Sequence, residues 1–250
     1  MSRTLAATLL ALLAALSLPA RAGSVQVAVA ANMAAPMQKI AAGFEAATGH
    51  KAVVALGSTG KFHAQIRNGA PFEVLLAADD ETPAKLEQEG HGVRGTRFTY
   101  ATGRLALWSA DAAAVDAQGA VLRQPPAGKL AIADPLVAPY GAAALETLTK
   151  LGVLAAWQPH LVRGENIGQA FQFVATGNAR LGFVALAQVM ADGRITRGSA
   201  WLVPADLHAP LRQDAVLLNP GASSEAARAL LEYLRSEPAR TVLRGYGYTF

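Results

Sequence analysis

The residues that could carry out an enzymatic reaction do not occur at the spacings that such reactions need. The chain contains no cysteine, which excludes a thiol nucleophile and thiolate metal sites. Its five histidines never stand three or four residues apart, so no helical pair of metal ligands is predicted. The segment Gly57-Ser58-Thr59-Gly60 is not a nucleophile elbow, and Gly60-Lys61 lacks the preceding glycine of a phosphate-binding loop. We therefore expect no catalytic residues.

An acidic cluster, Asp79-Asp80-Glu81, follows a short apolar run that is typical of a strand. Three carboxylates could bind a hard cation. A solvated loop that leads into a helix explains the same residues, because acidic side chains are favourable in the first turn of a helix. The second interpretation is favoured.

Neutral hydrogen-bond donors recur where expected strands run into expected helices. Four turns share this character: Ala31-Asn32-Met33, Ser58-Thr59-Gly60, Pro139-Tyr140-Gly141 and Glu165-Asn166-Ile167-Gly168. The first N–H groups of a helix have no partner within the helix and lie at the positive end of its dipole, so they attract anions. Helix capping alone explains any single turn. Four such turns together favour an anion site at the carboxyl ends of the strands.

The elements that must position these turns are short apolar strands alternating with helices. Strands are expected at 24–31, 51–56, 72–78, 104–109, 129–133, 179–186 and 215–218. Such alternation predicts βαβ units and largely parallel sheets. Because no flexible linker is visible, we expect two α/β lobes joined by strands. Lobe I would comprise residues 23–103 and 211–250, and lobe II residues 104–210.

The composition and the N-terminus place the chain in a broad class. Of 250 residues, 52% are hydrophobic and 16% charged, which predicts one or two packed domains. The formal net charge of +4 comes without a Lys/Arg-rich block, so nucleic-acid binding is not expected. Residues 1–22 have a basic start, an uncharged apolar run and Ala20-Arg21-Ala22, the pattern of a secretory signal peptide. We expect export, with no membrane insertion after cleavage.

With these turns and this N-terminus, the chain resembles the periplasmic molybdate-binding proteins, the receptors of ABC-type molybdate importers. The similarity runs from Val27-Ala-Val-Ala-Ala-Asn32 to Gly245-Tyr-Gly-Tyr-Thr-Phe250, through Gly57-Ser-Thr-Gly-Lys-Phe62, Asp134-Pro135 and Leu181-Gly-Phe-Val184. The resemblance implies a type II periplasmic-binding-protein fold, with two lobes that are each a mostly parallel sheet flanked by helices. It also implies capture of molybdate or tungstate without catalysis or a cofactor, molybdenum being held only as the oxyanion.

The resemblance carries ligand contacts onto particular residues of this sequence. It assigns the first contact to Asn32, the second to Thr59 with Ser58 beside it, the third to the region of Tyr140 and the fourth to the N–H of Ile167. Many relatives offer a fifth donor, a Tyr hydroxyl, where this chain has Ala185. Tyr140 is the nearest substitute for that donor.

The resemblance further implies a membrane permease as partner, a periplasmic location and a monomer. A receptor of the same fold for sulfate, phosphate or a small organic acid stays open, since Arg163 lies close to the fourth turn and could bind a carboxylate. A ferric receptor is not favoured, because Tyr246 and Tyr248 are expected to lie away from the four turns. An exported hydrolase using Asp79 or Ser58 is the least favoured alternative.

Overall fold

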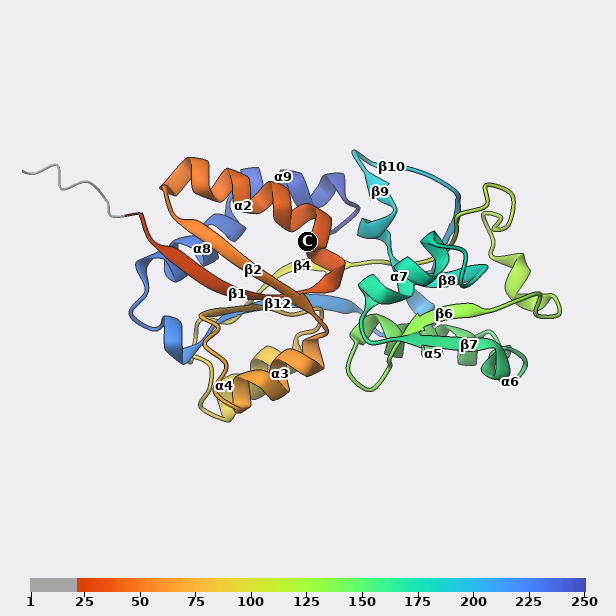
Figure 1. The fold of residues 1–250 in the computed structure, drawn as a ribbon, viewed down its shortest axis with the longest axis horizontal. Coiled ribbons are helices and arrows are strands. Elements are labelled where there is room, and N and C mark those ends of the chain that lie inside the picture. The colour runs from red at the N-terminus through yellow and green to blue at the C-terminus, as the bar shows by residue number, and fades with distance from the viewer. Residues whose placement is uncertain (1–21) are drawn as a thin grey trace, which may run out of the picture.

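The structure is a computed structural model that describes residues 22–250. The expected signal peptide, residues 1–22, lies outside this part of the chain except for its last residue. Two five-stranded sheets, each flanked by helices, form two lobes that lie side by side (Figure 1). Within residues 22–250, no helix combines the length and the apolar character needed to cross a membrane.

The sheet of lobe I has the strand order β2-β1-β3-β12-β4. Its strands are β1 (Ser24–Ala30), β2 (Lys51–Gly57), β3 (Val74–Leu76), β4 (Phe98–Gly103) and β12 (Leu211–Leu217). Strand β1 pairs in parallel with β2 and β3, whereas β12 runs antiparallel between β3 and β4. The sheet is therefore mainly parallel, with one antiparallel strand inserted where the chain returns from the other lobe.

Helices cover both faces of this sheet. They are α2 (Ala34–Thr48), α3 (Thr59–Arg67), α4 (Glu81–Gln88), α8 (Glu225–Arg235) and α9 (Glu237–Gly245). Helices α2, α8 and α9 lie on one face, and α3 and α4 lie on the other (Figure 1). Successive side chains of a strand point to opposite faces, so Val27 and Val29 pack in the cluster that holds Phe44, whereas Ala28 packs with Phe62. The continuous apolar run at the end of β1, residues 27–30, follows from this burial on both faces.

The sheet of lobe II has the strand order β11-β5-β8-β6-β7. Its strands are β5 (Leu105–Ser109), β6 (Leu130–Ala133), β7 (Leu161–Gly164), β8 (Leu181–Ala185) and β11 (Ser199–Leu202). Helices α5 (Pro139–Lys150), α6 (Leu154–Trp157) and α7 (Ile167–Ala175) flank it. Strand β6 pairs in parallel with β7 and β8, and β5 pairs antiparallel with β8 and β11.

Shorter elements complete the fold. A hairpin is formed by β9 (Met190–Ala191) and β10 (Arg194–Ile195). Single 3-10 turns lie at Ala31–Met33, Ala120–Arg123, Gln158–His160, Leu186–Gln188, Ala205–Leu207 and Asn219–Gly221. The chain passes from the first sheet to the second between β4 and β5, and it returns between β11 and β12.

The predicted α/β class, with two lobes and mainly parallel sheets, is confirmed. Strands β4, β7 and β11, the β9–β10 hairpin and helices α6 and α9 were not predicted from the sequence. Strand β7 has only four residues, one of them glycine, and β4 mixes threonine and glycine with its apolar residues, so neither contains the continuous apolar run by which the other strands were predicted. Helix α9 begins only two residues after α8 ends, and Pro238 at its start marks the break.

Candidate anion-binding site

Four helices begin at one small cavity between the lobes. The 3-10 turn Ala31–Met33 leads into α2, and α3, α5 and α7 begin at Thr59, Pro139 and Ile167. The cavity is lined by Ala30, Ala31, Asn32, Gly57, Ser58, Thr59, Ala78, Ala138, Pro139, Tyr140, Asn166 and Ile167. All five residues that the sequence analysis singled out as ligand contacts are in this set. Two come from elements of lobe II and three from elements of lobe I.

The cavity is buried and carries no side-chain charge among the residues that the structure describes. Asn32, Thr59 and Tyr140 each expose only 1% of their surface. Burial also raises the pKa of the Tyr140 hydroxyl well above its ordinary value, so this group keeps its proton at physiological pH. The electrostatic character of the cavity is therefore set by neutral dipoles, above all by the positive ends of the helices.

The hydroxyl groups of the α3 turn are placed as donors. The Thr59 hydroxyl oxygen accepts a hydrogen bond from the Ala78 N–H (3.0 Å), which leaves the single hydroxyl hydrogen of Thr59 for another acceptor. The neighbouring Ser58 hydroxyl is buried and has no hydrogen-bond partner. Buried polar groups without partners are rare in proteins, and this one lines the cavity.

Asn32 takes part in a buried network that sequence reasoning did not predict. Its Nδ2 donates to Gln213 Oε1 (2.9 Å) and to the Tyr248 hydroxyl (2.8 Å), while its Oδ1 has no partner. The expectation that Tyr248 lies away from the turns is wrong. The C-terminus returns to the lobe junction because Thr249 pairs through its backbone with Thr102 at the end of β4.

Tyr140 lies where α5 begins, and its hydroxyl accepts a hydrogen bond from Gln213 Nε2 (3.0 Å). Ala185, where many relatives were expected to carry a tyrosine, is fully buried at the end of β8 and does not line the cavity. Gln213 itself was missed. The available signal was the Gln213-Asp214 pair directly before the apolar end of β12, in a strand that is otherwise buried there.

The fourth turn is shaped by its own cap. Asn166 Oδ1 accepts from the Gln169 N–H (3.1 Å), and Gln188 Nε2 donates to the Ile167 carbonyl (3.0 Å). The Ile167 N–H lies in the first helical turn, where no intrahelical acceptor exists. Arg163, the residue that could have bound a carboxylate, is exposed on β7 and is not part of the lining.

The lobes touch on either side of the cavity. The Gly60 N–H donates to the Val137 carbonyl (2.9 Å), which joins the start of α3 to the loop before α5. The exposed pair Lys61–Glu165 (2.8 Å) joins the starts of α3 and α7. An anion in the cavity would therefore be enclosed by both lobes.

Comparison with known proteins assigns the chain to a family. Residues 25–249 match the family of bacterial extracellular solute-binding proteins. The chain belongs to this family. The match spans both sheets and all four helix starts that surround the cavity.

Individual relatives are similar to this protein over nearly the whole chain. The molybdate-binding protein ModA of Azotobacter vinelandii is 58% identical over 93% of this chain and 92% of its own length. ModA of Rhodobacter capsulatus is 52% identical over 97% of this chain and 94% of its own length. A solved structure, the periplasmic molybdate-binding protein of Azotobacter vinelandii, superimposes with a TM-score of 0.86 at 39% identity, covering 90% of this chain and 99% of that one.

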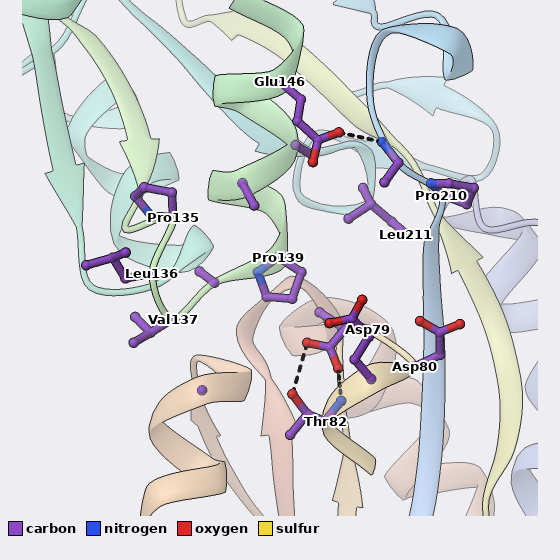
Figure 2. Close-up of a pocket in the computed structure, with 17 residues that line it drawn as sticks. Asp79, Asp80, Thr82, Pro135, Leu136, Val137, Pro139, Glu146, Pro210 and Leu211 are labelled. Atoms are coloured by element: carbon purple, nitrogen blue, oxygen red, sulfur yellow. Dashed lines mark hydrogen bonds between the residues drawn. The ribbon is translucent and has the colours of Figure 1, made fainter. Parts of the chain in front are cut away.

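In this solute-binding protein a second, larger cavity of about 310 Å³ also lies between the lobes (Figure 2). Asp79, Asp80, Glu81 and Glu146 line it, so its carboxylates would repel an oxyanion. Asp79 accepts two hydrogen bonds from Thr82, and Asp80 pairs with Arg212 (2.6 Å). Among the described residues no group of three His, Cys, Asp or Glu side chains is arranged to hold a metal.

Proposed function

We propose that this protein captures molybdate, or tungstate, between its two lobes and delivers it to the membrane permease of an ABC importer. The observation that carries the proposal is the convergence of four helix starts, with Ser58, Thr59 and Tyr140, on one uncharged, buried cavity. The similarity to molybdate-binding relatives over more than nine-tenths of the chain supports the choice of oxyanion.

The donor set suits a fully deprotonated tetrahedral dianion. An oxyanion taken out of water must regain its solvation, and each hydrogen bond to a charged group contributes about 1.5–3 kcal/mol. Hydroxyl and N–H donors from both lobes could together reach four oxygens. Hydrogen phosphate carries a proton of its own, which would face a donor and weaken its binding. Sulfate carries none, so only the size of the cavity would discriminate against it.

Closure of the lobes is the movement that this function needs. The open and closed states differ in whether both halves of the site contact the anion, so the anion favours the closed state. The contacts Gly60–Val137 and Lys61–Glu165 join the two lobes and would hold them together in the closed state. The closed receptor would present both lobe surfaces to the permease.

The N-terminal segment and the relatives bear on where the protein would act and as what class of protein. Export by the N-terminal segment would place it in the periplasm, where a monomer would meet the permease. The named relatives are binding proteins, which supports a receptor without catalytic activity or cofactor.

Calorimetric titration of the mature protein with molybdate, tungstate, sulfate, phosphate and acetate tests the proposal. We expect molybdate and tungstate to bind with similar affinity, because their size and charge nearly match, and the other anions to bind at least 100-fold more weakly, a difference of about 2.7 kcal/mol. Equal binding of sulfate would contradict the selectivity, and no binding of any tetraoxyanion would refute the receptor function.

A further inference from the structure

Gln213 links the two halves of the candidate site. It lies on β12, is fully buried, and stands at an irregularity in the pairing of β12 with β4. Its Oε1 accepts from Asn32 Nδ2 (2.9 Å) and from the Tyr100 hydroxyl (3.0 Å), and its Nε2 donates to the Tyr140 hydroxyl (3.0 Å). Asn32 belongs to lobe I and Tyr140 to lobe II, so one amide group contacts both lobes behind the cavity.

We propose that Gln213 is a positioning residue that makes the Tyr140 hydroxyl a hydrogen-bond donor to the bound oxyanion. The inference rests on the proposed function, because it concerns the same cavity. Gln213 does not line that cavity and would act only through Tyr140.

The orientation of the Tyr140 hydroxyl follows from the number of its hydrogens. A hydroxyl has one hydrogen and two lone pairs. Because Gln213 Nε2 occupies a lone pair, the hydrogen must point to a different acceptor. The nearby Tyr248 hydroxyl accepts from Asn32 Nδ2 and donates to the Asn32 carbonyl, which leaves it one lone pair that can take this hydrogen in the ligand-free protein. An oxyanion in the cavity that Tyr140 lines would be a charged and therefore stronger acceptor.

The orientation of the Gln213 amide is coupled to that of the Asn32 amide. If the amide were reversed, its Nε2 would face Asn32 Nδ2, two donors against each other, and the Tyr140 hydrogen would turn toward Gln213 Oε1. The Asn32 amide would then have to reverse as well. The structure has the first arrangement, in which Gln213 Nε2 donates to the Tyr140 hydroxyl. This arrangement adds cooperative strength, because a hydroxyl that accepts a hydrogen bond donates a stronger one.

A glycine lies next to the Gln213–Tyr140 pair and leaves space for it. Gly103 ends β4 at the crossing between the lobes, and a Cβ atom at this position would overlap both the Tyr140 hydroxyl and Gln213 Nε2. Glycine at position 103 is therefore needed for the Gln213–Tyr140 contact, independently of the hydrogen-bond pattern.

A double-mutant cycle with molybdate as the probe tests the proposal. Gln213→Met keeps the length of the side chain and removes the donor, and Tyr140→Phe removes the hydroxyl. We expect each single variant to bind molybdate roughly 10-fold more weakly, and the double variant to bind no more weakly than Tyr140→Phe alone. Thr147→Val is the matched control, because Thr147 is fully buried on the same helix and bonds only to the Ala143 carbonyl. It should lower the melting temperature without changing the affinity.

Gln213→Glu provides a second variant that keeps the acceptor for Asn32 and Tyr100. A carboxylate cannot donate, so it would draw the Tyr140 hydrogen away from the anion and add a repelling charge. We expect a larger loss of affinity than in Gln213→Met. If the wild type binds molybdate but Gln213→Met or Tyr140→Phe binds it with unchanged affinity, the proposal is overturned and the receptor function stands. The same conclusion follows if the two losses multiply to about 100-fold in the double variant. Absence of molybdate binding by the wild-type protein would overturn both.

Discussion

At the scale of single residues, the hydroxyl groups at the cavity are of two kinds. One kind has a hydrogen-bond partner in the protein, and the other would find a partner only in a ligand. Thr59 and Ser58 are adjacent and both buried, but only the Thr59 oxygen has a partner in the protein, the Ala78 N–H. A buried hydroxyl without a partner costs about 1–3 kcal/mol of stability. The two residues should therefore respond to substitution in different ways.

Ser58→Ala removes the hydroxyl that has no partner. We expect the free energy of unfolding of the ligand-free protein to stay the same or to rise by about 1 kcal/mol, because the desolvation cost of that hydroxyl disappears. Molybdate affinity should fall by roughly 10- to 150-fold, the loss of a hydrogen bond to a charged group. Urea denaturation and calorimetry measure the two effects. A less stable variant with unchanged affinity would show that Ser58 has only a structural role.

Thr59→Ala removes both the acceptor of the Ala78 N–H and a donor to the anion. We expect the free energy of unfolding and the affinity each to fall by about 1–3 kcal/mol. Thr59→Ser is the matched control, since it keeps the hydroxyl and should restore most of both quantities. If Thr59→Ala loses stability but binds molybdate as tightly as the wild type, the hydroxyl serves only Ala78.

At the scale of elements, the acidic cluster lies at the start of α4. Asp79 Oδ1 accepts from the Thr82 N–H (2.9 Å) near the first turn of α4. Burial nevertheless raises the pKa of Asp79 to about 6, an effect larger than the lowering by the hydrogen bonds from Thr82. A carboxyl group with a raised pKa favours its protonated form in the folded state, so its contribution to stability falls as the pH rises from about 4 to about 6.

Asp79→Asn keeps the acceptor for Thr82 and removes the charge. Above pH 6, we expect the free energy of unfolding of the variant to exceed that of the wild type by about 1–3 kcal/mol. The difference should shrink as the pH falls and become small near pH 4, because most of the linkage lies between the pKa values of Asp79 in the unfolded and folded chains. Thermal melts of both proteins between pH 4 and 8 measure the gap. A gap that does not depend on pH would argue against a raised pKa.

At the scale of the whole molecule, Gly60 decides whether the lobes can meet. It donates its N–H to the Val137 carbonyl, and a Cβ at this position would lie 2.9 Å from Val137 Cα. The start of α3 and the loop before α5 approach each other here through their backbones. A Cβ at position 60 would therefore push these two segments, and with them the lobes, apart.

Gly60→Ala should therefore weaken molybdate binding without removing any donor to the anion. We expect at least a 10-fold loss, about 1.4 kcal/mol, with no loss of ligand-free stability, because alanine is the better helix former. In small-angle X-ray scattering, saturating molybdate should compact the wild type more than the variant. Gly245→Ala in α9 is the control, since its nearest neighbour would lie 3.7 Å away. Equal compaction and equal affinity in Gly60→Ala would contradict this role.

The sequence by itself determined the features that depend on neighbours along the chain. Apolar runs such as Val25–Val29 predict buried strands, and polar turns such as Ser58-Thr59-Gly60 predict helix starts, because periodicity and capping act within a few residues. These local signals marked the four turns, and the resemblance to molybdate-binding proteins selected Asn32, Ser58, Thr59, Tyr140 and Ile167 within them, which the structure brings to one cavity.

Only the tertiary structure decided what lies behind that cavity. Gln213 reaches Asn32 across 181 residues and Tyr140 across 73, and Tyr248 reaches Asn32 across 216. These contacts depend on the insertion of β12 between β3 and β4 and on the return of the C-terminus to β4. No periodicity or cap encodes such pairings, because the strand order of a sheet is set by the packing of the whole chain. Local sequence placed the donors, and the long-range order of the sheets determined which side chains hold them.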